Sequence, residues 1–194
     1  VADSAQGFMN RSRRILFKDR RSVQELFAPF ADERKPFLLE SSLDVEGMGR
    51  YSFFGSEPFA TLTFGRGGLR IEEEGRSRLS REAPLCALRE MLARYTLRKP
   101  SGRWPFLCGA IGFLSYDFGF TLEDFSRRRK ALDPVPDVCF SFYDSVVAKD
   151  HLTDEVLVFS SGFPATGVGR GRRAQERLER IRRKLAAGAG FPRL

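Results

Sequence analysis

The sequence predicts an α+β (α/β) fold, in which a mainly antiparallel sheet carries packed helices. Three patterns support this prediction. Two long apolar runs, at about 106–116 and 138–148, are typical of strands. The run 59–74 alternates its side chains on either side of a glycine-rich turn at 65–68, as a β-hairpin does. The run 82–95 repeats large apolar residues at spacings of three and four, which indicates an amphipathic helix.

The segment before the hairpin is predicted to hold short elements. Residues 1–14 are expected to form a loose lead-in. The run 22–30 is expected to be a helix, because Ser22 can cap it and Glu25 follows three residues later. Strands are predicted at 37–41 and 50–55, with a turn-rich loop between them.

The segment after 106 is predicted to hold the longest strands. The run 106–116 is apolar nearly throughout, which is typical of a strand covered on both faces, and its glycines indicate a bulge or a close backbone approach. A last strand is expected at 155–161, which leaves His151 in a hairpin loop. Residues 163–171 are expected to be a linker, and 172–187 a helix with a narrow apolar stripe and a broad basic face.

The composition indicates a globular protein, with 42% hydrophobic and 30% charged residues. The net charge of +8 is uneven. Arg170–Lys184 holds eight basic and two acidic residues, a net of +6, which leaves +2 for the rest and argues against nucleic-acid binding by the whole protein. No apolar run is long enough to cross a membrane. The three cysteines lack metal-ligand spacing, and Cys108 and Cys139 lie in apolar strands, so we expect buried free thiols in a reducing compartment, the cytoplasm.

The sequence contains no catalytic constellation of its own. No serine or cysteine is accompanied by the residues of a nucleophilic triad, and the single histidine excludes a His-based metal site. The glycines at 65–68 are followed by another strand rather than by a helix, so they do not predict a phosphate-binding loop. No catalytic or metal-binding residue is therefore predicted.

Four motifs, in this order, carry a resemblance to a known family: FLLES (37–41), GRYSFFG (49–55), GAIGFLSYDFG (109–119) and PDVCFSFYDSVV (136–147), the last followed by Asp150-His151. The chain resembles, from about 36 to 160, the N-terminal domain of chorismate-utilising synthase component I. That family includes aminodeoxychorismate (para-aminobenzoate) synthase component I and anthranilate synthase component I. One departure is Phe120, where the family usually has an arginine.

The resemblance implies that this chain and a C-terminal domain have different roles in the intact enzyme. Residues 1–162 would be the anthranilate synthase component I-like N-terminal domain, half of a two-layer fold, and 163–194 would be a linker and basic helix leading toward a C-terminal chorismate-binding domain. That domain, absent from this chain, would hold the catalytic residues and Mg²⁺, so no cofactor is expected here. A glutamine amidotransferase subunit (component II) would supply ammonia to this cytoplasmic enzyme.

The resemblance also implies a site for L-tryptophan. The matching positions are Leu39, Glu40, Ser41, Arg50, Tyr51 and Ser52. A serine hydroxyl and nearby backbone groups can bind an ammonium or a carboxylate, and an apolar wall can hold an indole. Glu40 would oppose the ammonium or pair with Arg50. The alternative is that both motifs are neighbouring core strands, kept for packing.

The resemblance implies two alternative functions, and the basic residues indicate a third. The first is a non-catalytic structural and regulatory domain of aminodeoxychorismate synthase component I, in folate biosynthesis. The second is the same domain of anthranilate synthase component I, in tryptophan biosynthesis, with feedback inhibition by tryptophan. The third is a free-standing basic binding module built on 127–130 and 170–184.

Overall fold

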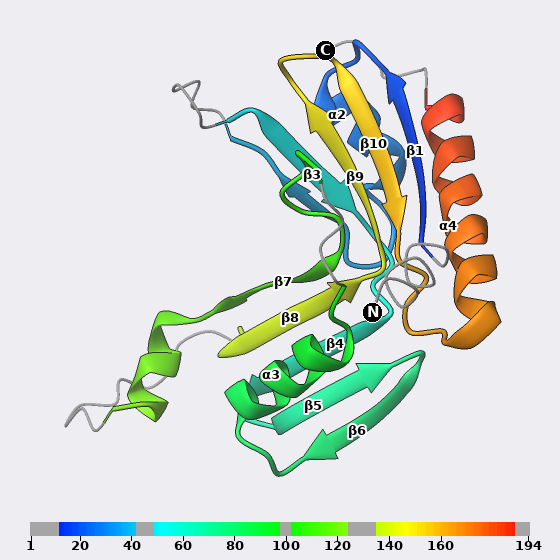
Figure 1. Ribbon diagram of the computed structural model, residues 1–194. Helices are drawn as coiled ribbons and strands as arrows, with labels where there is room; N and C mark the ends of the chain where they lie inside the picture. Colours follow the sequence, from blue (N-terminus) through cyan, green and yellow to red (C-terminus); the bar gives the residue numbers. More distant parts are fainter. Residues whose placement is uncertain (1–11, 42–48, 98–101, 124–134, 189–194) are drawn as a thin grey trace. The chain divides into compact units, whose positions relative to one another are not determined.

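The chain forms two antiparallel five-stranded sheets, as a computed structural model shows (Figure 1). The structure describes residues 12–41, 49–97, 102–123 and 135–188. Contacts divide the chain into two compact units. Unit 1 comprises 1–58, 97–109 and 143–194, and unit 2 comprises 59–96 and 110–142. The predicted fold class is confirmed.

The sheet of unit 1 has the strand order β1-β10-β9-β3-β2. All its described pairings are antiparallel, and Arg13 at the start of β1 pairs with Ser160 at the end of β10. Its elements are β1 (Arg13–Lys18), α2 (Val23–Phe27), η1 (Ala28–Phe30), β2 (Phe37–Leu39), β3 (Tyr51–Gly55), β9 (Ser145–Asp150), β10 (Glu155–Ser160) and α4 (Gly167–Ala187).

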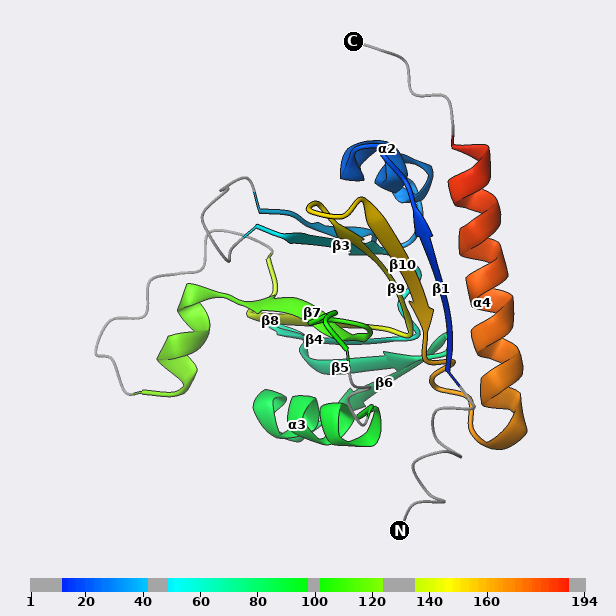
Figure 2. The same ribbon diagram turned by 45° about the horizontal axis from the view of Figure 1, so that its top comes forward.

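The core of unit 1 lies between this sheet and its helices. Helix α4 runs beside β1 and contacts β10, β1 and η1 (Figure 2). Ser22 and Glu25 form the predicted capping box at the start of α2. The buried side chains of this core come from every layer: Val23, Leu26, Phe30, Phe54, Val147, Val156, Val158, Leu178, Ile181 and Leu185.

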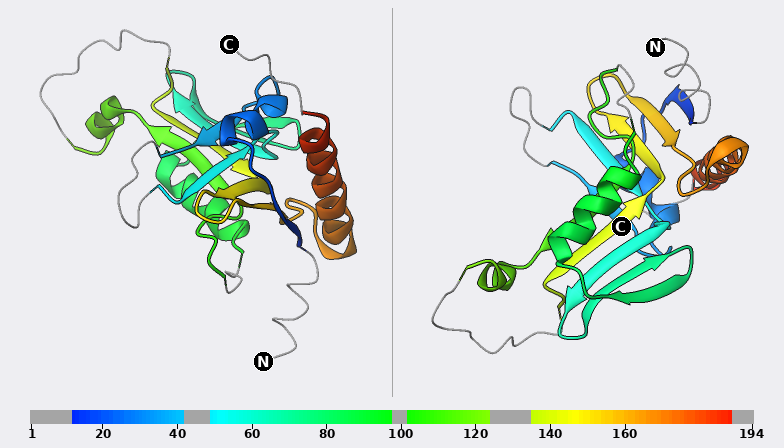
Figure 3. Two further views of the ribbon diagram at one scale, coloured as in Figure 1. Left: turned by 90° about the horizontal axis from the view of Figure 1, so that it is seen from above. Right: turned by 60° about the horizontal axis from the view of Figure 1, so that its bottom comes forward.

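Unit 2 is a smaller sheet with one helix, and its strand order is β6-β5-β4-β8-β7. Helix α3 lies along one face of this sheet (Figure 3). Tyr95, just past α3, packs edge-on against Phe59 and Phe142 at the strand ends. The elements are β4 (Ala60–Gly65), β5 (Gly68–Glu73), β6 (Arg76–Ser80), α3 (Pro84–Arg94), β7 (Gly109–Leu114), η2 (Tyr116–Thr121) and β8 (Val138–Tyr143).

Four predictions need correction. The run 138–148 is not one strand, because it breaks at Asp144 into β8 and β9, which belong to different sheets. Arg13 and Arg14 lie in β1 rather than in a loose lead-in. The strand β7 is not covered on both faces, since Phe113 and Leu114 are exposed. The expected linker at 163–171 ends early, because α4 begins at Gly167.

The predicted boundary between 162 and 163 stays a prediction. In the described chain, α4 packs onto the sheet of unit 1 rather than standing apart from it. The basic run 127–130 lies outside the described residues.

Candidate functional site

The six residues predicted to bind tryptophan lie at one end of the β2–β3 pair in unit 1. Leu39 is opposite Phe53 in the antiparallel register, so Leu39, Tyr51 and Phe53 share one face of the sheet. Ser52 is on the other face with Phe54, which packs into the core beneath α2. Glu40 points to the helix side too, because its carboxylate accepts hydrogen bonds from Nε2 of Gln24 in α2, at 2.6 and 2.8 Å. The six residues therefore divide between two faces.

Arg50 is fixed by a buried carboxylate on the neighbouring strand. Its Nη2 donates to Oδ2 of Asp150 at 2.8 Å, and its Nε donates to Oδ1 at 3.2 Å. Burial opposes ionisation of Asp150, but the hydrogen bonds from Arg50 and from the backbone N–H of Leu152 outweigh it and lower the pKa of this carboxyl. Arg50 therefore pairs with Asp150, and the expected pairing with Glu40 is not formed.

Ser52 is held by His151, in the turn that follows Asp150. The hydroxyl of this fully buried serine lies 2.7 Å from Nε2 of His151. The backbone N–H of His151 also donates to the carbonyl of Arg50, at 2.9 Å. His151 is the turn residue that the sequence predicted, and it also anchors the start of β3.

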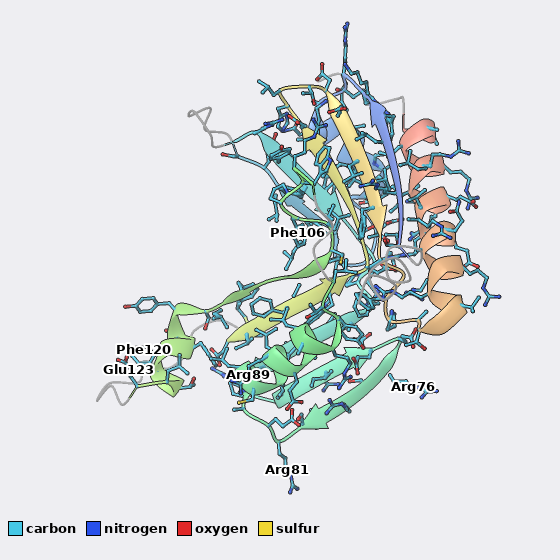
Figure 4. All side chains as sticks on the ribbon, in the orientation of Figure 1. Arg76, Arg81, Arg89, Phe106, Phe120 and Glu123 are labelled. Carbon is cyan, nitrogen blue, oxygen red and sulfur yellow. The ribbon has the colours of Figure 1, made fainter. Side chains whose placement is uncertain are left out.

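Aromatic rings cover the face of the sheet opposite α2 and α4. Tyr51 lies 5.4 Å from Trp104, and Phe53 lies 5.8 Å from Phe106, at ring centroids. Figure 4 labels Phe106 on the segment that leads into β7. We call these four rings the aromatic face. They make an apolar wall of the kind that an indole ring requires.

A guanidinium lies at each end of the Tyr51–Trp104 pair. The Arg50 carbon Cζ is 5.0 Å from the Tyr51 ring centroid, and that of Arg103 is 5.3 Å from Trp104. Arg103 is itself paired with Glu155. Sequence reasoning named Arg50 and Tyr51 but missed the roles of Asp150 and Trp104. The Asp150-His151 dipeptide, part of the family resemblance, was the available signal.

The basic helix α4 directs much of its charge inward. Asp144 is fully buried, accepts hydrogen bonds from Arg177 at 2.9 and 3.1 Å, and lies 3.4 Å from Nε of Arg173. Arg180 and Lys184 are both paired with Glu33. Four basic residues are thereby used to hold α4 on unit 1, which reduces the charge available to an outside partner.

The cysteines are all free thiols. Cys108 and Cys139 are half-buried rather than fully buried, and Cys86 is exposed. Burial raises the pKa of the Cys108 thiol to about 12, and a hydrogen bond with Ser161 opposes only part of this effect. This thiol is therefore a poor nucleophile at neutral pH.

Unit 2 has a hollow of its own at η2, with a volume of about 370 Å³. Its lining includes Phe120 and Glu123, which Figure 4 labels at that end of the unit. The sequence analysis named Phe120 as a departure from the family that the chain resembles. Tyr116 on the same rim is 94% exposed.

Within the described ranges, no three His, Cys, Asp or Glu side chains gather closely enough to hold a metal ion. The described residues thus do not fit a Mg²⁺ site. None of the described helices is long and apolar enough to span a membrane.

No family model matches the chain. The crystal structure of anthranilate synthase component I from Streptococcus pneumoniae TIGR4 superposes with a TM-score of 0.55 at 23% identity, over 80% of this chain and 32% of that one. The protein thus has the fold found in part of that structure.

Curated relatives show which proteins are similar to the chain in sequence. The chain is 31% identical to aminodeoxychorismate synthase component 1 of Klebsiella aerogenes over 145 residues, which is 74% of this chain and 32% of the relative. It is 33% identical to anthranilate synthase component 1 of Bacillus caldotenax over 146 residues, 72% of this chain and 29% of the relative. The chain is therefore homologous, over most of its length, to the N-terminal part of component I of these two synthases. It spans about a third of the length of these relatives.

Proposed function

We propose that this chain is the N-terminal structural and regulatory domain of aminodeoxychorismate synthase component I, which aminates chorismate in folate precursor synthesis. The observation that carries the proposal is the 31% identity to the Klebsiella aerogenes enzyme over 74% of the chain. The described residues offer no catalytic constellation, so the chemistry, with chorismate and Mg²⁺, is assigned to a separate chorismate-binding domain. Component II, a glutamine amidotransferase, would supply ammonia to this enzyme in the cytoplasm.

The second candidate is the same domain of anthranilate synthase component I. Its support is the 33% identity to the Bacillus caldotenax protein and the shared fold with the Streptococcus pneumoniae structure. Both candidates predict the same dependence on a catalytic domain, and they differ in the product.

Turnover tests the proposal and separates the two candidates. The purified chain is incubated with chorismate, Mg²⁺ and ammonium, alone and with a separately produced chorismate-binding domain from the same source. We expect no product from the chain alone, and aminodeoxychorismate from the mixture. Anthranilate would select the second candidate, and activity of the chain alone would contradict the assignment of the chemistry to another domain.

A basic binding module is the remaining alternative, and salt dependence distinguishes it. Binding of nucleic acid through the arginines of α4 would weaken steeply as salt rises, whereas apolar docking to a catalytic domain would not. The inward pairing of Arg173, Arg177, Arg180 and Lys184 favours the domain interpretation.

We also propose that L-tryptophan binds at the β2–β3 end of unit 1. Its support is the exposed residue Ser41, the guanidinium of Arg50 and the aromatic face that begins at Tyr51. Replacing Ser41 by phenylalanine in the assembled enzyme should abolish inhibition by tryptophan, because the ring fills the space next to the polar contacts. Unchanged inhibition of the Ser41→Phe enzyme would remove Ser41 from the site.

A further inference from the structure

Asp150 occupies an unusual place for a carboxylate in unit 1. Its side chain is fully buried, directly opposite Tyr51 in the β3–β9 register and opposite Glu155 in the β9–β10 register. Two carboxylates on adjacent strands thus each hold an arginine that lies over a ring, Asp150 with Arg50 on Tyr51 and Glu155 with Arg103 on Trp104. The result is a row of four side chains, Arg50–Tyr51–Trp104–Arg103, with a carboxylate at each end.

The pairing with Asp150 leaves one edge of the Arg50 guanidinium available. Asp150 engages Nε and Nη2 only, and within the described part of the chain Nη1 has no hydrogen-bond partner. The Arg50 side chain is 39% exposed. A guanidinium can bind a second carboxylate through its free edge, so this arrangement presents a donor beside an aromatic wall. The complementary ligand has a carboxylate next to an aromatic group.

We propose that Asp150 is a positioning residue for the tryptophan site: it holds the Arg50 guanidinium over Tyr51 with Nη1 directed to the ligand carboxylate. This inference rests on the tryptophan site proposed above. Asp150 does not touch the ligand, and it acts by restricting Arg50 to one orientation. Without that restriction, the long side chain must lose rotational freedom when the ligand binds, which weakens binding.

The test uses the 194-residue chain labelled with ¹⁵N, since arginine Nε–H groups give their own NMR signals. An Arg50→Lys variant assigns the Arg50 signal by its disappearance. L-Tryptophan is titrated into the wild-type chain and into Asp150→Asn, which keeps the shape of the side chain and removes its charge. We expect the Arg50 signal of the wild type to move as tryptophan is added. The tryptophan concentration at the midpoint of this titration should be at least fivefold higher for Asp150→Asn than for the wild type.

The matched control is Glu73→Gln. Glu73 also pairs with an arginine, Arg94, but in unit 2, so its loss should leave the midpoint within twofold of wild type. The amide spectrum and the indole N–H signal of Trp104 report whether each variant is folded. If Asp150→Asn does not fold, Asp150→Glu replaces it, because this variant keeps the charge and displaces the carboxylate by one methylene. Its midpoint should lie between those expected for wild type and Asp150→Asn.

The outcomes separate the two proposals. A wild-type chain in which tryptophan moves neither the Arg50 signal nor the Trp104 indole signal contradicts the tryptophan site itself. A wild-type response with an equal midpoint in Asp150→Asn keeps the site and overturns the role of Asp150. A response in wild type and Glu73→Gln that is weakened in Asp150→Asn supports both.

Discussion

At the scale of single residues, the buried carboxylate of Asp144 makes the contacts that matter most for holding α4 in place. Asp144 lies where the chain passes from β8 to β9. Its carboxylate accepts a hydrogen bond from Arg177 and forms an ion pair with Arg173, both in α4. Arg177 also donates to the carbonyl of Glu57, at 2.8 Å, just before the chain enters unit 2. Arg177 therefore connects α4 to Asp144 and to Glu57, two residues of unit 1 next to places where the chain passes between units.

Replacing Asp144 by alanine should lower the free energy of unfolding by about 3–5 kcal/mol, because it leaves two arginines near a buried site without their counter-charge. Urea denaturation followed by circular dichroism measures the change. The control is Glu176→Gln, which removes an exposed carboxylate paired with Arg172 on the same helix and should leave the midpoint unchanged. Equal midpoints for the two variants would show that Asp144 contributes no more than a surface charge.

Residue patterns also explain which parts of the candidate site were predictable. Alternation along a strand is enough to place Tyr51 and Ser52 on opposite faces, although the sequence analysis assigned both to one site. Their partners were not predictable in the same way, because Asp150 and His151 lie about a hundred residues further along the chain and no local period connects them. Trp104 has no local signal of this kind either, because its place against Tyr51 depends on how the segment before β7 crosses the sheet.

At the scale of elements, β7 depends on a glycine. A Cβ atom at Gly112 would lie 1.9 Å from the carbonyl oxygen of Cys139 on β8, so the two backbones approach as closely as only glycine permits. The sequence predicted this close approach from glycines inside an apolar strand, and the structure confirms it at Gly112.

Gly112→Ala should therefore destabilise unit 2 by at least about 1 kcal/mol, because β7 must shift away from β8 to relieve the overlap. Hydrogen exchange of the β7 and β8 amides would report the loosened pairing. Gly119→Ala is the control, since a Cβ there meets no atom within 4 Å. Unaltered exchange in Gly112→Ala would mean that β7 is not held against β8 in solution.

The two strands that sequence analysis missed share a physical cause. Both are polar edge strands: β6 reads RSRLS and is largely exposed, and β1 reads RRILFK with only Ile15 and Phe17 facing the core. Charged edge strands are common because they discourage pairing with other chains. Their hydrophobic signal is weak for the same reason. By contrast, α2 and the hairpin of β4 and β5 were predicted because a capping box and a glycine turn are local signals.

At the scale of the whole molecule, carboxylates with lowered pKa values link stability to pH, among them Asp19, Glu33 and Asp150. The pKa of Asp19 is lowered chiefly by its hydrogen bond with Arg21. Burial opposes the ionisation of Glu33 and Asp150, yet the bonds from Lys184 and Ser56 to Glu33, and those from Arg50 to Asp150, lower both pKa values. A pKa below its unfolded value means that the folded state favours the charged carboxylate.

The stabilisation from these groups should be fully present above about pH 5 and should fall as the pH drops below about 4, when the carboxylates become protonated. Urea midpoints measured between pH 7 and pH 3 would show this decline. The triple variant Asp19→Asn, Glu33→Gln, Asp150→Asn should begin with a lower midpoint and lose less of it on acidification. Parallel curves for the variant and the wild type would assign the acid sensitivity to other groups.

The pairing of β1 with β10 has a consequence for synthesis on the ribosome. Arg13 pairs with Ser160, and these positions are 160 − 13 = 147 residues apart. At about 5–20 residues per second, roughly 7–30 s of translation separate the emergence of a strand from that of its neighbour. All of unit 2 emerges during that interval. Strand β1 therefore remains without its partner β10 during that interval, and the arginines and lysine of β1 protect it from aggregation in the meantime.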